Sequence, residues 1–463
     1  MTSQLILLCF AAFIGASVCN RVYVHPFNLY AFNKTQCQKD TEQNKTVNIE
    51  DTIVPVYIDL NIKPEDLLES KISLETPPQR PGNSQGLNYL TSLMNHLGFR
   101  IFEVLRDVNT EDTVLMSYTN LYSSLVSFYL GTSKNTSSNL QEILGFVDPS
   151  GDKNCLSKVD GFKVISALRA IDNLLSEDAN IDALKILCMF VAKGVPISQQ
   201  FVENLIPSAD SIYLASIDFK NPLNAADVIN EFLEVQSSKK SKYILKDIDA
   251  SANFLFTSHM YFNGKLKNSF SIPELQDFWI EPDKKISVPM MSVSGMFQYK
   301  IDDRANQLVL RIPLGQNNFL LLIQPTNGNT IENIKSSLTW KSYLTLLNRL
   351  STSYITITMP TLEIESAYDI QDMLSRLNLA YLLGKNANFD KISNTDLNVG
   401  KIINKVYFKL DDDDSKQVED LSLDKEALPK EFKLNKPFFL AVFEGTTKAL
   451  LFAGKVINPV NVN

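Results

Sequence analysis

Apolar residues change their spacing along this chain, and the change limits the folds that it can adopt. In residues 87–105 and 121–130 they recur every three or four positions, which predicts amphipathic helices. Later apolar runs are short and alternating or continuous, which predicts strands at residues 307–313, 319–324, 354–359, 405–410, 438–443 and 449–456. Helices come first, strands follow and no βαβ rhythm repeats, so the pattern favours an α+β fold.

The first 19 residues have the features of a secretory leader. An apolar run at residues 5–14 is followed by small side chains, and the expected cleavage point lies between Cys19 and Asn20. The region before the run contains no Lys or Arg, which departs from the usual leader. A retained membrane anchor is the alternative, but the run is too short to span a bilayer. We therefore expect a secreted protein.

Composition points to a soluble extracellular protein. The chain is 44% apolar, which is ample for a large core, and its net charge is −8. An acidic balance argues against nucleic acid or an anionic membrane as the main partner.

Three cysteines remain after removal of the leader, so at most one internal disulfide can form. Cys188 lies in an apolar stretch, where a thiol behaves as a small hydrophobic group. Cys37 and Cys155 both lie in polar, loop-like sequence, and this pair is preferred. Such a bond would tether the N-terminal tail to the body. Three free thiols are the alternative, which an oxidising compartment disfavours.

Residues 30–85 are polar and read as an arm and linker. A short apolar patch at residues 53–62 is expected to dock on the body. Asparagine glycosylation is expected at three sequons in polar segments, Asn33, Asn44 and Asn135.

Residues 20–30 read NRVYVHPFNLY and begin at the expected leader cleavage point. They resemble the angiotensin peptide hormones, so a cut between Leu29 and Tyr30 would release a decapeptide, residues 20–29. Pro26 fixes its own φ and restricts His25, which predicts an extended segment suited to a protease cleft.

The peptide resemblance implies partners and later steps. Two large apolar side chains flank the scissile bond, which suits an aspartic protease, and the resemblance implies renin. A converting dipeptidase would then remove Asn28 and Leu29 to leave an octapeptide, residues 20–27. An angiotensin receptor would recognise that peptide, with effects on vasoconstriction, blood pressure and salt balance, through Arg21, Tyr23, His25, Pro26 and Phe27.

The rest of the chain resembles the serpin family. Family-like blocks follow in order at residues 99–105, 121–131, 135–136, 140–146, 288–291, 321–325, 432–439 and 451–459. The resemblance implies a serpin domain over residues 86–463. Its fold would have about nine helices around three β-sheets, with an exposed reactive-centre-like loop and the N-terminal segments as an extension.

The loop chemistry argues against protease inhibition. Inhibitory serpins insert a small-residue hinge as a strand of the central sheet, but the aligned stretch here is charged, and unpaired buried charges cost several kcal/mol. Ser258 and Asn404 also depart from the family's polar control positions. An inhibitor of a secreted serine protease remains the alternative reading. A third hypothesis is a carrier that releases a small ligand when the loop moves, and the sequence contains no pocket evidence for or against it. The non-inhibitory hinge comprises Asp414, Ser415, Lys416, Gln417, Glu419 and Asp420.

Nothing in the sequence indicates catalysis, a cofactor or a metal. A Ser-His-Asp arrangement could use only His96 or His259, and neither lies near a G-x-S-x-G motif. No P-loop, HExxH or dinucleotide fingerprint is present. Repulsion keeps the acidic run at residues 411–414 solvated, and it lacks the further oxygen ligands that calcium needs.

Overall fold

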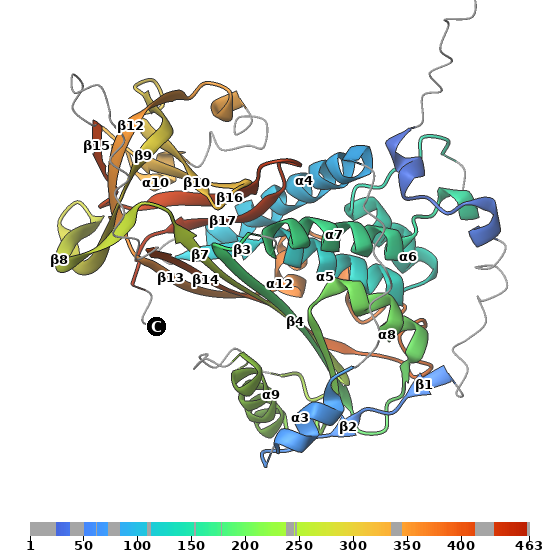
Figure 1. Ribbon diagram of the computed structural model, residues 1–463. Coiled ribbons are helices and arrows are strands. Elements are labelled where there is room, and N and C mark those ends of the chain that lie inside the picture. Colours follow the sequence, from blue (N-terminus) through green and yellow to red (C-terminus); the bar gives the residue numbers. More distant parts are fainter. Residues whose placement is uncertain are drawn as a thin grey trace, which may run out of the picture.

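The structure is a computed structural model of the 463-residue chain. It describes residues 25–37, 51–61, 63–72, 84–108, 113–151, 154–176, 178–237, 245, 248–334, 345–412 and 430–460. The expected α+β fold is confirmed: helices pack around three sheets of six, nine and two strands (Figure 1).

The six-stranded sheet is the centre of the molecule. Its order is β13-β14-β7-β4-β6-β2, and it is covered on both faces at the continuous apolar run of β4, residues 186–191. Leu187 and Met189 face the large core under α5 and α7, whereas Cys188 and Phe190 face a smaller core under α9 (Figure 1). The strands are β2 (Val56–Tyr57), β4 (Ile181–Ala192), β6 (Ser211–Ile217), β7 (Phe254–Leu266), β13 (Leu362–Asp369) and β14 (Val399–Asp412).

The nine-stranded sheet contains most of the strands predicted from late apolar runs. Its order is β15-β12-β9-β10-β11-β16-β17-β3, and β8 pairs with β9 beside this path. A third sheet joins β1 to β5. The strands are β1 (Thr52–Ile53), β3 (Val114–Ser117), β5 (Ile197–Ser198), β8 (Ser269–Glu281), β9 (Lys284–Asp302), β10 (Gln307–Leu314), β11 (Asn318–Pro325), β12 (Ser351–Pro360), β15 (Lys430–Lys433), β16 (Phe438–Glu444) and β17 (Leu450–Val456).

Both predicted helices are confirmed as α4 and α5. The side chain of Ser117 caps α5 by accepting from the Asn120 amide, and Gly131 is its last residue. None of the described helices combines the length and apolar character of a membrane span. The α-helices are α3 (Pro64–Ser70), α4 (Ser84–Val108), α5 (Tyr118–Gly131), α6 (Lys134–Ile143), α7 (Gly161–Ser176), α8 (Gln199–Leu205), α9 (Pro222–Ser237), α10 (Ile331–Ile334) and α12 (Ile370–Arg376), and the 3₁₀ helices are η1 (Pro26–Leu29), η3 (Cys155–Ser157), η4 (Ile206–Ser208) and η6 (Ala380–Leu382).

The arm docks on the edge of the six-stranded sheet, as its apolar patch predicts. β2 pairs in parallel with β6, and β1 pairs with β5. Beyond the strand, the Ile58 amide donates to the Ser216 carbonyl (2.9 Å) and the Ile72 amide donates to the Ile212 carbonyl (2.8 Å). The described part of the arm therefore contributes two short strands, β1 and β2, and the helix α3, where the sequence predicts only a linker with a docking patch.

β7 and β14 are directly paired, in a parallel register that runs from Phe254 to Leu266 on β7. Stacked aromatic pairs cross this join on opposite faces, Tyr261 on Tyr407 (5.3 Å) and Phe262 on Phe408 (4.9 Å). No strand lies between β7 and β14, so the central sheet is closed at this join.

A buried polar network joins α5 to the same two strands. Asn120 donates through Nδ2 to the Ser258 carbonyl (3.2 Å), and the Ser258 hydroxyl donates to Asn120 Oδ1. The Ser124 hydroxyl lies 3.2 Å from Asn404 Oδ1. Ser258 and Asn404 are opposite each other in the ladder, so the two departures from the family pattern meet in one network.

We expect His259 to make the stability of the closed sheet depend on pH. It lies beside Lys405 across the ladder, and its Nε2 has no hydrogen-bond partner among the described residues. Burial, and then the Lys405 ammonium, lower the pKa of His259 from 6.5 to about 3. As the pH falls below 6.5, His259 takes up a proton in the unfolded chain but stays neutral in the folded chain until the pH nears 3. The free energy of unfolding therefore decreases between these two pH values.

We expect His259→Gln to remove that dependence. Between about pH 6 and pH 4, the free energy of unfolding of the unsubstituted protein should fall by up to about 1.4 kcal/mol per pH unit more than that of the variant. Urea unfolding at a series of pH values measures both slopes. Parallel curves would contradict the assignment.

Candidate functional site: the clipped N-terminal segment

The described part of the peptide segment is helical, so the prediction of an extended segment is wrong for these residues. Pro26–Leu29 forms η1, and only His25, at the N-cap, keeps extended angles (φ −60°, ψ 134°). Proline disfavours a helical conformation in the residue before it, but its own φ suits the first position of a helix. The His25 Nδ1 atom accepts from the Phe27 amide (3.3 Å), which stabilises this turn.

The bond between Leu29 and Tyr30 lies at the end of η1 and is covered by the body. Phe27 is fully buried, Tyr30 is buried and Leu29 is half-buried, whereas Asn28 is exposed. The Tyr30 and Phe146 rings pack edge to face, with their centroids 5.7 Å apart. Burial, followed by the proximity of Tyr89, raises the pKa of Tyr30 well above its ordinary value. The residue after the scissile bond therefore occupies an apolar pocket.

Phe146 reaches this pocket because α6 ends in a Schellman motif. The Phe146 amide donates to the Gln141 carbonyl (3.1 Å) and the Gly145 amide donates to the Glu142 carbonyl (2.9 Å). Gly145 has φ +87°, a conformation that favours glycine. The apolar residue after such a glycine packs back on the body, and Phe146 covers Tyr30 in this way.

Backbone hydrogen bonds hold residues 30–32 antiparallel to residues 158–160. The Asp160 amide donates to the Tyr30 carbonyl (2.8 Å), and the Phe32 amide donates to the Lys158 carbonyl (3.0 Å). The bridge between them pairs Ala31 with Val159. We call residues 30–37, held against residues 155–163, the clip.

Side chains extend the clip toward Cys37. Gln36 donates through Nε2 to Asp160 Oδ2 (2.7 Å), and Lys163 donates through Nζ to the Gln36 Oε1 (3.3 Å). Asn33 and Gln36 form a reciprocal capping pair: Asn33 Oδ1 accepts from the Gln36 amide (2.8 Å), and Gln36 Oε1 accepts from the Asn33 amide (3.0 Å). This pair starts the helical residues 34–37 and aims Cys37 at the body.

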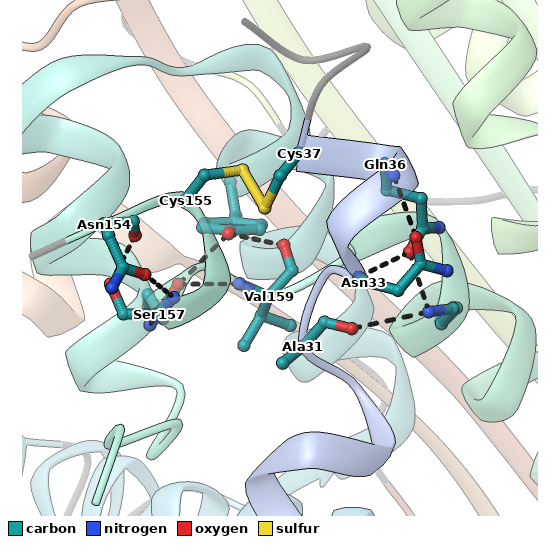
Figure 2. The surroundings of a disulfide bond; sticks show 11 residues. Ala31, Asn33, Gln36, Cys37, Asn154, Cys155, Ser157 and Val159 are labelled. Carbon is teal, nitrogen blue, oxygen red and sulfur yellow. Dashed lines mark hydrogen bonds between the residues drawn. A yellow bond between two sulfur atoms is a disulfide. The ribbon is translucent and has the colours of Figure 1, made fainter. Parts of the chain in front are cut away.

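The expected disulfide is present in the structure. Cys37 and Cys155 are bonded, with their Cα atoms 5.5 Å apart, and 118 positions separate them in sequence (Figure 2). Cys188 is free and buried, and burial raises the pKa of its thiol to about 12, which keeps it unreactive. The chain is therefore tied covalently to the body at Cys37, seven positions after Tyr30.

The remaining predicted sites are two exposed glycosylation sites and a set of residues that the structure does not describe. Asn33 and Asn135 are exposed, as glycan acceptors must be, and the Asn33 cap uses the oxygen of its amide and leaves the nitrogen for a sugar. Outside the described residues lie Cys19, Asn20, Arg21, Tyr23, Asn44 and the hinge residues Asp414, Ser415, Lys416, Gln417, Glu419 and Asp420.

The described residues offer no assembled catalytic or metal centre. His96 is exposed on α4, and His259 lies in the central sheet. Within the described ranges, no three His, Cys, Asp or Glu side chains gather closely enough to hold a metal ion.

Three comparisons with known proteins agree on the relatives of this chain. The family model described as "Serpin (serine protease inhibitor)" matches residues 92–459. Angiotensinogen of Bos taurus is 33% identical over 98% of this chain and 97% of its own length, and angiotensinogen of Homo sapiens is 30% identical over 98% and 97%. The crystal structure of mouse protein-Z dependent protease inhibitor covers 82% of this chain and 100% of its own, with a TM-score of 0.67 and 19% identity, a likeness of fold.

Proposed function

The chain belongs to the serpin family and, within it, to the angiotensinogens, and from this premise we propose that it is a secreted precursor of angiotensin-type peptide hormones. Cleavage between Leu29 and Tyr30 would release the decapeptide, residues 20–29. The protease is renin, an aspartic protease, by analogy with the angiotensin sequence that this segment resembles.

The position of the clip supports this proposal most directly. Its backbone hydrogen bonds to the body and its disulfide all lie on the Tyr30 side of the scissile bond. Before the bond, Phe27 and Leu29 pack on the body through their side chains. A single cut therefore separates a small peptide, whose described residues are held by side-chain packing, from a body that keeps the covalent tie of the clip.

Cleavage requires local opening of the segment. A protease cleft binds an extended chain, whereas the bond lies at the end of a helical turn with Tyr30 in its pocket. Burying one large apolar side chain is worth about 1.5–3 kcal/mol, so closure keeps the cleavable state scarce. Such masking would protect the bond from other proteases until renin captures the open state.

The released decapeptide would then be processed further. A converting dipeptidase would remove Asn28 and Leu29, and the octapeptide would carry a terminal Phe27 carboxylate to an angiotensin receptor. The buried state of Phe27 in the precursor fits this scheme, because the receptor-binding side chain is hidden until release. The resulting effects are vasoconstriction and control of blood pressure and salt balance.

The same proposal assigns the body no catalytic or inhibitory role. The closed join between β7 and β14, with aromatic pairs on both faces, opposes the strand insertion that inhibitory serpins use. The body would present and protect the peptide in plasma as a glycosylated monomer.

Digestion with renin followed by mass spectrometry tests the function. We expect two products, the decapeptide of residues 20–29 and a body that begins at Tyr30. The new N-terminal segment of that body should still be bonded to Cys155 through Cys37. Leu29→Lys should abolish that product, because a charged group would replace the apolar side chain before the cut. A digest without the decapeptide, or with a first cut elsewhere, would overturn the proposal.

A further inference from the structure

A polar hollow lies beside the turn between β9 and β10, on the opposite side of the molecule from α6 (Figure 1). Its volume is about 530 Å³, which is within the range of small-molecule sites. Most such sites are lined by apolar side chains, whereas nearly all the lining residues of this one are charged. We call it the basic hollow, and its lining residues are Lys300, Asp302, Asp303, Arg304, Ala305 and Arg349.

Lys300 and Asp302 neutralise each other inside the hollow. The Lys300 Nζ atom donates to Asp302 Oδ2 (2.5 Å), and both side chains are partly buried. This hydrogen bond lowers the pKa of Asp302, so its carboxylate stays charged and bound to Lys300. The pair therefore contributes no net charge to the hollow.

The two arginines of the hollow have no such partner. Both are exposed, and neither Arg304 nor Arg349 forms an ion pair with a residue that the structure describes. Asp303 is the other carboxylate of the lining, so the hollow is left with one net positive charge on a chain whose net charge is −8. Two guanidiniums that face one hollow repel each other, and a bound anion would relieve that repulsion.

Hydrogen bonds hold the backbone that carries both arginines. In the turn, Asp302 Oδ1 accepts from the Ala305 amide (3.3 Å), and Asn329 Nδ2 donates to the Ala305 carbonyl (3.3 Å). On the facing segment, the Arg349 amide donates to the carbonyl of Leu346 (3.0 Å), which is buried. Two segments far apart in sequence are therefore held so that each places a guanidinium on the same hollow.

We propose that the basic hollow binds a phosphate or sulfate ester of a small polar molecule such as a sugar. A guanidinium presents parallel N–H donors that match the oxygens of these groups, so Arg304 and Arg349 hold the ester group from two sides. The described lining has no aromatic or branched apolar side chain, so the rest of the ligand is polar. The site lies apart from the peptide segment and is independent of the proposed function.

Isothermal titration calorimetry of the full chain with glucose 6-phosphate, glucose 6-sulfate and glucose tests this site. We expect both esters to bind and glucose not to bind, and the tighter ester identifies the preferred group. Arg304→Gln/Arg349→Gln should weaken binding at least about tenfold, because charge-assisted hydrogen bonds are lost.

A matched control removes the same charge elsewhere. Arg100 on α4 and Arg376 on α12 are exposed and lie outside the hollow lining, so Arg100→Gln/Arg376→Gln should bind the esters as the unsubstituted protein does. Both double variants should unfold at the same temperature as the unsubstituted protein, because all four side chains are exposed. An equal loss of affinity in the control would mean that net charge alone attracts the esters, and would overturn the site.

Asp303→Asn gives a readout of the opposite sign. It removes the carboxylate that opposes an anion, so it should strengthen binding of the esters about threefold. Weaker binding by this variant would contradict an anion site. Binding of glucose as tight as that of the esters, or no binding of either ester at about 10 mM, would also refute the proposal.

Discussion

Phe146→Ala will cost the protein about 3–5 kcal/mol of unfolding free energy and will speed cleavage of the Leu29–Tyr30 bond. Phe146 is 2% exposed, and its ring forms edge-to-face pairs with Tyr30 and Tyr89, with centroids 5.7 and 6.1 Å apart. An edge-to-face pair is worth about 1 kcal/mol beyond its buried area, so its loss, with the cavity that follows, raises the open population roughly tenfold. Urea unfolding and the cleavage rate at limiting renin measure the two effects.

A matched control separates local opening from general instability. Phe319 is 3% exposed and stacks on Phe443 in the nine-stranded sheet (5.0 Å), outside the clip. Phe319→Ala should lose comparable stability without a change in cleavage rate. Equal acceleration by both variants would mean that global unfolding, and not release of Tyr30, exposes the bond.

Asn120→Ala is expected to cost about 3 kcal/mol, because two buried partners lose their hydrogen bonds at once. Asn120 is fully buried, and its amide group bonds both the carbonyl and the hydroxyl of Ser258. Ser258→Ala removes only one of these bonds and should cost about 1 kcal/mol. Urea unfolding of both variants measures the two losses of unfolding free energy, which should differ about threefold.

Hydrogen exchange can show whether Asn120→Ala weakens the join between β7 and β14. β7 and β14 are joined where Ser258 faces Asn404, so hydrogen exchange of backbone amides in both strands should accelerate in Asn120→Ala. If Asn120→Ala were as mild as Ser258→Ala, the network would not hold the join. The closed sheet would then depend on the aromatic pairs alone.

Much of the fold could be predicted from the sequence, because most elements bury one regular face. α4 and α5 follow from helical spacing, and β10, β11, β16 and β17 from apolar runs, since the core removes those side chains from water. Lys185 shows the limit of such patterns. It is 2% exposed on β4, where its Nζ lies 2.8 Å from the Ser123 hydroxyl and 3.7 Å from Asp172 Oδ2. These partners belong to separate helices, so no local pattern reveals them.

The site was only partly predictable, for the same reason. The Cys37–Cys155 pair follows from the context of three cysteines, but the cover over Tyr30 depends on long-range contacts with Phe146 and Asp160. Two local signals in the sequence mark parts of this site. The Gly145-Phe146 pair at a helix end marks a Schellman motif, and Asn33 with Gln36 marks a capping pair.

The docked arm also bears on how copies of this protein behave in concentrated solution. Without residues 55–72, β6 would present a seven-residue hydrogen-bonding edge, Ser211–Ile217, to any strand of another molecule. The arm occupies that edge from Ile212 to Ser216, and the strand that it adds is only two residues long. Very short outermost strands are a natural defence against aggregation. Because the cut falls before Tyr30, release of the peptide leaves the arm paired with β6. The cleaved body should therefore resist self-association as well as the precursor does.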